Sequence, residues 1–195
     1  GNCHMGGHAE YTASKAGVSR EDADSFSLRS HQKAVAAIES GRFKNEIAPV
    51  EIPGRKGVTV VDTDEGPRAD TSLEALAKLN PAFVKDAPAG LTRHVVTAGN
   101  APGLNDGAAA LVVASWEYAE AHGLAVDAVI SAYAVGATEP KDLFFAPIDA
   151  VQKLMAKEGK AIGDYELVEV NEAFAVQAIA AMRALGMDEE RVNVN

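Results

Sequence analysis

An asparagine stands between an expected strand and an expected helix near the end of the chain. Residues 167–170 are mostly apolar, as in a buried strand, and a helical pattern begins at Ala173. Free backbone N–H groups at the start of a helix point toward one spot, together with the positive end of the helix dipole. Asn171 in this place can orient a water or a ligand oxygen and stabilise an oxyanion. The alternative is that Asn171 only caps the helix, which is a more common use of asparagine.

Four potential metal ligands or nucleophiles lie close to the amino terminus: Cys3, His4, His8 and Glu10. His4 and His8 are one helical turn apart, but the pattern is not the His-Glu-x-x-His of zinc proteases and no second cluster follows it. Cys3 would need a neighbouring base and a shielded pocket to act as a nucleophile. We therefore expect no metal site and no catalytic role for Cys3.

Arg68 follows an acidic run at residues 62–65. It either pairs with these neighbours in a solvated loop or holds a phosphate group. Residues 97–100 and 105–107 are turns of small side chains, which either join other elements or let a ligand approach the backbone. The chain has no Walker loop and no Gly-x-Gly-x-x-Gly, so the sequence does not support nucleotide hydrolysis or dinucleotide binding.

The composition limits the classes of partner that the chain can bind. The 195 residues include 18 basic and 28 acidic side chains, a net charge of -10, and 47% are hydrophobic. A diffuse negative charge repels phosphate backbones and anionic lipid, so we expect no nucleic acid and no membrane partner. No apolar run approaches the roughly 20 residues of a membrane span. The single cysteine allows no internal disulfide, and we expect a reducing, cytoplasmic location.

The expected elements alternate in type after the first hundred residues. Ser19 opens a capping box, and apolar residues at helical intervals predict a helix over 20–40. Extended segments are expected at 46–53 and 58–61, helices at 73–79, 116–122, 148–157 and 173–185, and strands at 109–114, 126–135 and 167–170. Buried strands alternating with helices indicate an α/β fold, with a boundary near 95–105.

Eight short motifs carry a resemblance to a known family. They are, in chain order, His4-Met5-Gly6-x-x-Ala9-Glu10, Gly41-Arg42-Phe43-Lys44-x-Glu46-Ile47, Asp64-Glu65-x-x-Arg68, Ala77-Lys78-Leu79-x-Pro81-x-Phe83, Val96-Thr97-Ala98-Gly99-Asn100-Ala101, Leu104-Asn105-Asp106-Gly107-Ala108-Ala109-Ala110, Asn171-Glu172-Ala173-Phe174-Ala175 and Asn193-Val194-Asn195. With these motifs the chain resembles the thiolase family over essentially its whole length.

The resemblance implies a layered αβαβα fold in which two related α/β halves pack together and an inserted loop domain covers coenzyme A. By that pattern, residues 1–103 are most of the loop domain. Residues 104–123 are the closing strand and helix of the first half, and residues 124–195 open the second half. The implied activity is acyl transfer through a cysteine thioester, by reversible Claisen condensation or thiolysis of acyl-CoA with acetyl-CoA. The partners are acyl-CoA, CoA and further copies in a dimer or tetramer. No cofactor is implied beyond the CoA thioesters used as substrates.

The resemblance also implies roles for single residues. Asn171 would hold the water of an oxyanion hole, and this favours the oxyanion reading over the capping reading. The remaining positions form the acyl-CoA site: His4 and Met5 in the pantetheine and acyl channel, Arg68 at the adenosine phosphate end, Phe83 and Ala98 against CoA, and Phe174 as a wall of the acyl pocket.

The chain also departs from the family pattern. The family's nucleophilic cysteine lies upstream of the Met-Gly-x-x-Ala-Glu motif, and its catalytic histidine and second cysteine lie downstream of Asn-Val-Asn. The 195 residues alone are therefore expected to be inactive, poorly stable and prone to associate. The alternative is a non-catalytic CoA-binding or oligomerisation module. Pro102 replaces a serine that contacts pantetheine, and two aromatics at 144–145 leave the acyl chain length open.

Overall fold

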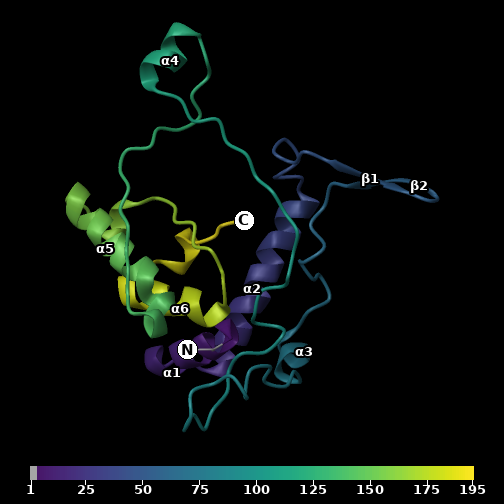
Figure 1. Ribbon diagram of the computed structural model, residues 1–195, viewed down its shortest axis with the longest axis vertical. Helices are drawn as coiled ribbons and strands as arrows, with labels where there is room; N and C mark the ends of the chain where they lie inside the picture. The colour runs from purple at the N-terminus through teal and green to yellow at the C-terminus, as the bar shows by residue number, and fades with distance from the viewer. Residues whose placement is uncertain (1–3) are drawn as a thin grey trace.

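The computed structural model describes residues 4–195 and has a helical body from which two extended parts project (Figure 1). The longer helices are α1 (Met5–Ala16), α2 (Arg20–Glu39), α5 (Ala146–Glu158) and α6 (Ala175–Leu185). Shorter ones are α3 (Leu73–Ala77), α4 (Trp116–Ala121) and the 3-10 turns η1 (Pro140–Phe145), η2 (Ile162–Asp164) and η3 (Glu189–Arg191). α6 packs against α1, α2 and α5, so segments from both ends of the sequence meet in the body.

Side-chain caps explain where the first two helices begin. The Ser19 hydroxyl accepts from the Asp22 N–H, and the Asp22 carboxylate accepts from the Ser19 N–H, both at 3.0 Å. This capping box confirms the predicted start of α2, which the structure ends at Glu39. α1 was not predicted from sequence, because its cap is unusual: the Nδ1 atom of His4 accepts from the Gly6 N–H at 3.1 Å.

The core lies where α6 meets α1 and α2. Five side chains in it are fully buried: Ala9, Ala23, Val96, Val176 and Ala178. Other members of this cluster are Ala13, Val18, Phe26, Val95, Phe144, Phe174, Ala175, Ile179, Met182 and Val192. No helix among residues 4–195 is both long enough and apolar enough to cross a bilayer.

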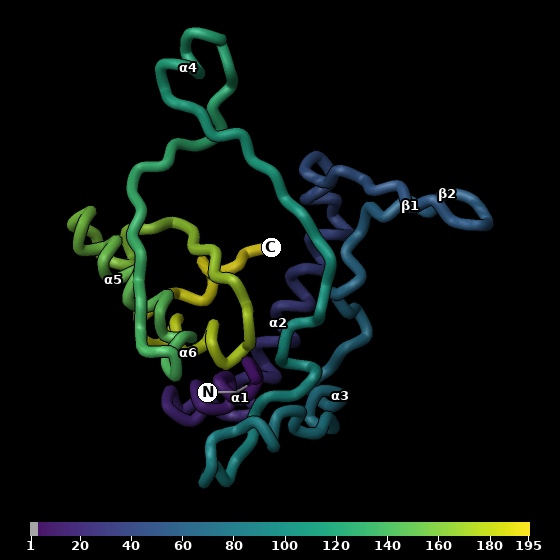
Figure 2. Tube along the Cα trace, viewed as in Figure 1, coloured from purple at the N-terminus to yellow at the C-terminus, as the bar shows by residue number. Residues whose placement is uncertain are grey.

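A β-hairpin projects from the body beyond the end of α2 (Figures 1 and 2). It consists of β1 (Val50–Gly54) and β2 (Gly57–Val61), which pair antiparallel from Val50 opposite Val61 to Gly54 opposite Gly57. The two extended segments predicted from sequence therefore form one hairpin, shifted along the first segment. Every residue of both strands is exposed.

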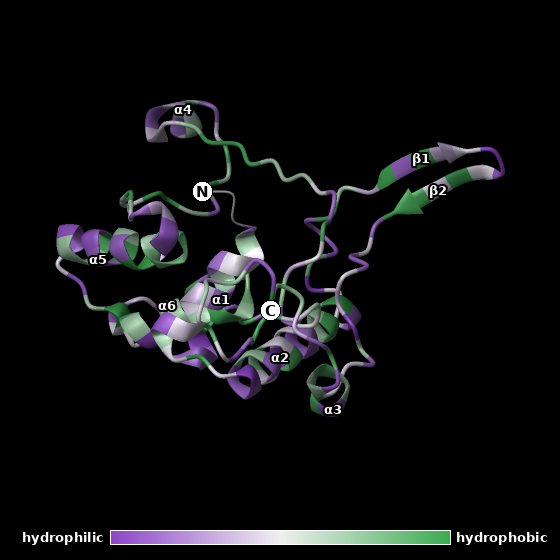
Figure 3. Ribbon diagram, turned by 60° about the horizontal axis from the view of Figure 1, so that its bottom comes forward, coloured by the Kyte–Doolittle hydropathy of each residue, from purple (hydrophilic) through white to green (hydrophobic). Residues whose placement is uncertain are grey.

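Residues 103–139 form an open arch that leaves the body and returns to it, with α4 at its far end (Figure 2). The predicted helix at 116–122 is present as α4, whereas the predicted strands at 109–114 and 126–135 have no strand partner. Figure 3 shows that this arch is largely hydrophobic on both sides of α4. A strand satisfies its backbone groups only by pairing with a neighbour, and within residues 4–195 no strand pairs with the arch.

The predicted strand at 167–170 is present only as a trace. Val168 forms a single parallel bridge with Val192, and the Val168 N–H donates to the Arg191 carbonyl at 2.9 Å. Beyond this bridge and one between Pro81 and Thr97, the described residues contain the two-stranded hairpin alone as sheet. Helices thus form as predicted, while the predicted buried strands do not.

Candidate functional site

Four aromatic rings from four separate segments form a continuous row. The His4 ring stacks on Phe83 with centroids 4.8 Å apart. Phe83 meets Phe174 edge to face at 6.3 Å, and Phe174 meets Phe144 in the same way at 5.4 Å. The row requires a glycine at position 6, since a Cβ there would overlap the Phe83 ring. Three residues predicted to lie in one site, His4, Phe83 and Phe174, are therefore brought together.

Asn171 lies next to the end of this row and does not cap α6. The N-cap of α6 is Phe174, and it makes no side-chain cap hydrogen bond. Asn171 is exposed and lines a hollow of about 360 Å³ that Phe144 and Gln177 also border. The capping alternative for Asn171 is thus wrong, and the residue lies at the edge of a mostly apolar hollow. Its role in holding an oxyanion water stays a prediction.

The backbone before α6 is fixed by the Asn-Val-Asn motif at the end of the sequence. The Asn193 side chain accepts from the Val170 N–H at 2.7 Å and donates to the Val170 carbonyl at 2.8 Å. It also donates to Glu172 at 2.7 Å, and Glu172 accepts from Ser30 on α2 at 2.6 Å. These bonds position the residues on both sides of Asn171. Asn193 itself has a φ of 45°, a left-handed conformation that asparagine tolerates better than most residues.

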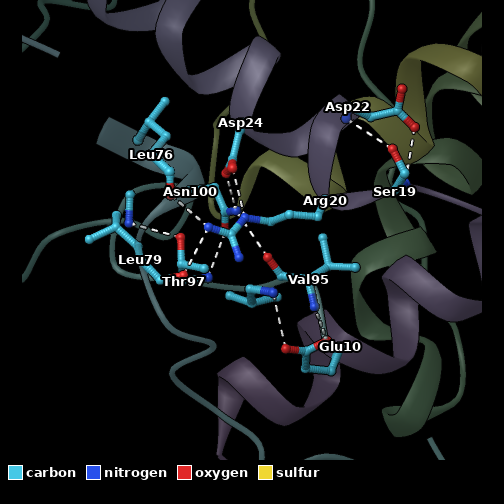
Figure 4. A network of polar contacts seen from close by, with 12 residues as sticks. Glu10, Ser19, Arg20, Asp22, Asp24, Leu76, Leu79, Val95, Thr97 and Asn100 are labelled. Carbon is cyan, nitrogen blue, oxygen red and sulfur yellow. Dashed lines mark hydrogen bonds and ion pairs between the residues drawn. The ribbon is translucent and has the colours of Figure 1, made fainter. Parts of the chain in front are cut away.

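A buried carboxylate organises the segment that leads into the turn at 97–100 (Figure 4). Glu10, only 1% exposed, accepts from the N–H groups of Val95 at 2.9 Å and Val96 at 3.0 Å. From sequence, Glu10 was a candidate metal ligand, and this structural use was not predicted. Its spacing from Ala9 and Ala13 on the buried face of α1 could have indicated it.

Asn100 continues the same network toward α2. Its side chain accepts from the Thr97 N–H at 2.8 Å and donates to Asp24 at 2.9 Å and to the Val95 carbonyl at 3.0 Å. Asp24 also pairs with Arg20 at 2.7 Å. The Asn100 carbonyl accepts from the Ala175 N–H at 3.1 Å, which links the turn to the first residue of α6. The turn therefore joins α2 and α6 and is not a free loop.

Phe83 and Ala98 come from two segments that lie side by side. The Ala82 N–H donates to the Val96 carbonyl at 2.9 Å, and Pro81 forms an antiparallel bridge with Thr97. Phe83 is half-buried and Ala98 is exposed. This pairing brings the two predicted CoA contacts to one edge of the body.

The two remaining residues predicted to contact CoA, Met5 and Arg68, are not part of the row of rings. Met5 is the first residue of α1 and is 47% exposed. Arg68 lies in the loop between β2 and α3, where its N–H donates to the Nδ1 atom of His31 on α2 at 3.2 Å. Its guanidinium forms no ion pair with the described residues, so the pairing with acidic neighbours considered from sequence is absent. His31 was not predicted from sequence, since it lies in no motif that indicates this contact.

No group of three or more histidine, cysteine, aspartate or glutamate side chains suited to a metal occurs among residues 4–195. His4 caps α1 and stacks on Phe83, and Glu10 is bonded to backbone N–H groups. Cys3 lies outside the described residues.

Comparison with known proteins identifies the class to which this fold and site belong. The family model described as the N-terminal domain of thiolase matches residues 1–117, and that described as the C-terminal domain matches residues 124–195. The chain therefore belongs to the thiolase family.

Individual relatives agree with this assignment. The chain is 49% identical over 193 residues to an acetyl-CoA acetyltransferase of Pseudomonas aeruginosa. This match covers 98% of this chain and 47% of that protein. It is 49% identical over 180 residues to a β-ketoadipyl-CoA thiolase of the same organism, covering 91% of this chain and 43% of that protein. The chain thus spans about half the length of the curated relatives it matches.

Solved structures confirm the predicted thiolase-like α/β fold. The crystal structure of the Bacillus anthracis acetyl-CoA acetyltransferase matches with a TM-score of 0.92 and 43% identity. That of human mitochondrial 3-ketoacyl-CoA thiolase matches with a TM-score of 0.89 and 40% identity. In both cases the match covers 98% of this chain and 47% of the other chain.

Proposed function

We propose that this chain supplies the CoA-binding and acyl-pocket part of a thiolase. The observation that carries the proposal is the row of rings from His4 through Phe83 and Phe174 to Phe144, with Asn171 at the neighbouring hollow. His4 is exposed and Phe83 is half-buried, so that end of the row offers a flat surface for a pantetheine chain, while Phe144 borders the hollow at the other end. Asn171 would hold a water that hydrogen-bonds the developing oxyanion of a thioester.

The reaction would be reversible Claisen condensation and thiolysis. An acyl group on a cysteine thioester is transferred to the α-carbon of acetyl-CoA, or in the reverse direction to the sulfur of CoA. The nucleophilic cysteine and the catalytic histidine and cysteine would come from outside these 195 residues. We further propose CoA thioesters as substrates with no other cofactor, a dimer or tetramer as the assembly, and the cytoplasm as the location. Such reactions belong to fatty acid metabolism.

Arg68 offers a direct test of the CoA part of this proposal. Its guanidinium, without an ion pair among the described residues, would meet the phosphates at the adenosine end of CoA. Titration calorimetry of CoA into the chain would measure this. Arg68→Ala should weaken binding about 10-fold or more, as expected for loss of a charge-assisted hydrogen bond.

The matched control is Arg55→Ala, which removes the same charge from the exposed tip of the hairpin. It should change the dissociation constant by less than about twofold, because a distant exposed charge contributes little. A wild-type chain that binds no CoA, or equal loss in both variants, would contradict the proposal. Turnover of acetoacetyl-CoA and CoA by the isolated chain would show that the chemistry does not require residues elsewhere.

A further inference from the structure

One imidazole connects α2 to the loop that carries Arg68. His31 is half-buried on α2, and its Nδ1 atom accepts from the Arg68 N–H at 3.2 Å. Because Nδ1 is the acceptor, the proton of the neutral ring is on Nε2. The contact exists only in this neutral tautomer, since a protonated ring would turn an N–H toward the Arg68 N–H.

The position of this loop depends on the contact. Among the described residues, no other hydrogen bond joins residues 62–71 to another element. A hollow of about 260 Å³ has His31 and Pro67 in its lining. Another of about 180 Å³ has Val35 on α2 and Arg68 in its lining. Among the described residues the hydrogen bond to His31 is therefore the only one that ties the loop to α2, and its loss leaves only side-chain contacts around these two hollows.

Two charged groups act on His31 from the elements packed against α2. Arg68 faces it from the loop, and Glu172 faces it from the segment before α6. Burial and the Arg68 charge lower the pKa of His31, and Glu172 opposes them by raising it. The folded pKa lies below the unfolded value, so the contact is fully present above the unfolded pKa and is lost as the pH falls through the folded pKa.

We propose that His31 is a positioning residue for CoA binding, whose neutral imidazole holds the Arg68 loop against α2 and so places the guanidinium at the phosphate end of CoA. This inference rests on the proposed function, because it takes Arg68 as a phosphate contact. His31 touches the backbone of Arg68 and acts on the ligand through it. Protonation of His31 releases the loop, because the protonated Nδ1–H then faces the Arg68 N–H and the imidazolium charge repels the Arg68 guanidinium.

Two substitutions of His31 test whether its hydrogen-bond acceptor positions the Arg68 loop. His31→Asn keeps a neutral acceptor near the place of Nδ1 and cannot titrate, whereas His31→Ala removes the acceptor. In calorimetric titration with CoA at about pH 7.5, His31→Ala should weaken binding about 5- to 30-fold, and His31→Asn should stay within about threefold of wild type. His122→Asn, the same change at the exposed residue that follows α4, should have no effect.

The pH profile gives a second readout that a merely structural role would not produce. Between about pH 7.5 and pH 5.5 the wild type should lose about 5-fold more affinity than His31→Asn. The variant serves as the reference because the CoA phosphates titrate near pH 6 in both proteins. Parallel loss in the two proteins, or unchanged binding by His31→Ala, would overturn the proposal while leaving CoA binding itself intact.

Hydrogen exchange of the Arg68 amide distinguishes failure of the proposed CoA-binding function from failure of the inference about His31. Protection of this amide should fall as His31 titrates, and it should be absent in His31→Ala. If the amide behaves in this way but the wild type binds no CoA at any pH, the proposed function fails and the role of His31 in CoA binding fails with it. If CoA binds and the amide is unprotected at every pH, only the inference about His31 is refuted.

Discussion

The helical body and the open arch contain similar apolar sequence, but they differ in how it is used. Val176 and Ala178 on α6 in the body are fully buried, whereas Leu111 and Val112 in the arch are 92% and 94% exposed. A helix satisfies its backbone hydrogen bonds internally and needs only one covered face. A strand needs a partner on at least one edge, so the same apolar residues remain exposed where the partner is missing. The difference is therefore one of hydrogen bonding and not of hydrophobicity.

The body adds a second feature that the arch lacks, a buried polar network. The side chains of Glu10 and Asn100 make five hydrogen bonds, with donor–acceptor distances between 2.8 and 3.0 Å. A low local dielectric makes each such bond stronger and makes its loss more costly. We expect the body to depend on a few polar residues, and the arch to depend on none of its own. The following predictions test this contrast.

The largest effect is expected for Glu10→Ala. This change leaves the N–H groups of Val95 and Val96 buried without an acceptor, each costing about 1–3 kcal/mol, for a total loss of about 2–6 kcal/mol. Urea unfolding followed by circular dichroism would measure the free energy of unfolding of the body. Ser14→Ala on the exposed side of the same helix is the control and should change stability by less than about 0.5 kcal/mol. Equal effects of the two variants would show that the network does not stabilise the body.

A smaller effect is expected at the start of α2. Ser19→Ala removes the hydroxyl that accepts from the Asp22 N–H and should cost about 1 kcal/mol. The Ser19 N–H bond is the main cause that holds the pKa of Asp22 below its usual range, with the Arg183 charge adding to it. Ser25→Ala, an exposed position in the middle of α2, should be neutral or slightly stabilising, because alanine favours helix. Destabilisation at Ser25 equal to that at Ser19 would argue against the cap.

Sequence alone predicted the elements whose signals are local. The capping box at Ser19 and the glycine after Leu185 fixed helix bounds because each acts within a few residues. The strands at 109–114 and 126–135 were predicted from apolar runs, and such runs indicate burial without identifying a partner. α1 was missed because a histidine cap is not a common signal. Local chemistry was therefore readable, and non-local pairing was not.

The same limit applies to the candidate site. The resemblance placed His4, Phe83 and Phe174 in one site, and the structure brings them into one row. It did not indicate that Asn193 holds the backbone beside Asn171 or that His31 holds the Arg68 loop. Those contacts join residues 23 and 37 positions apart and have no spacing pattern. The sequence thus indicated that these three rings belong together, and their contact with a ligand stays a prediction, whereas the residues that hold the neighbouring backbone required the structure.

The smallest effect is expected in the arch. Val112→Ser should change the free energy of unfolding of this chain by less than about 0.5 kcal/mol, because the side chain is already in water. The matched change Val176→Ser, in the fully buried position on α6, should cost about 2–4 kcal/mol, since it removes apolar contact and buries a hydroxyl. Both are measured by the same urea unfolding.

A cost for Val112→Ser comparable to that for Val176→Ser would mean that the arch is covered in solution, for example by strands of a second copy. Dilution then separates the explanations, because the stability of an associated arch depends on protein concentration and that of an isolated chain does not. In a protein that also contains the pairing strands, Val112→Ser should become as costly as a core substitution. The extended segments of the arch would then be strands that lack a partner here. The difference in burial between the arch and the body would be due to the missing strand pairing alone.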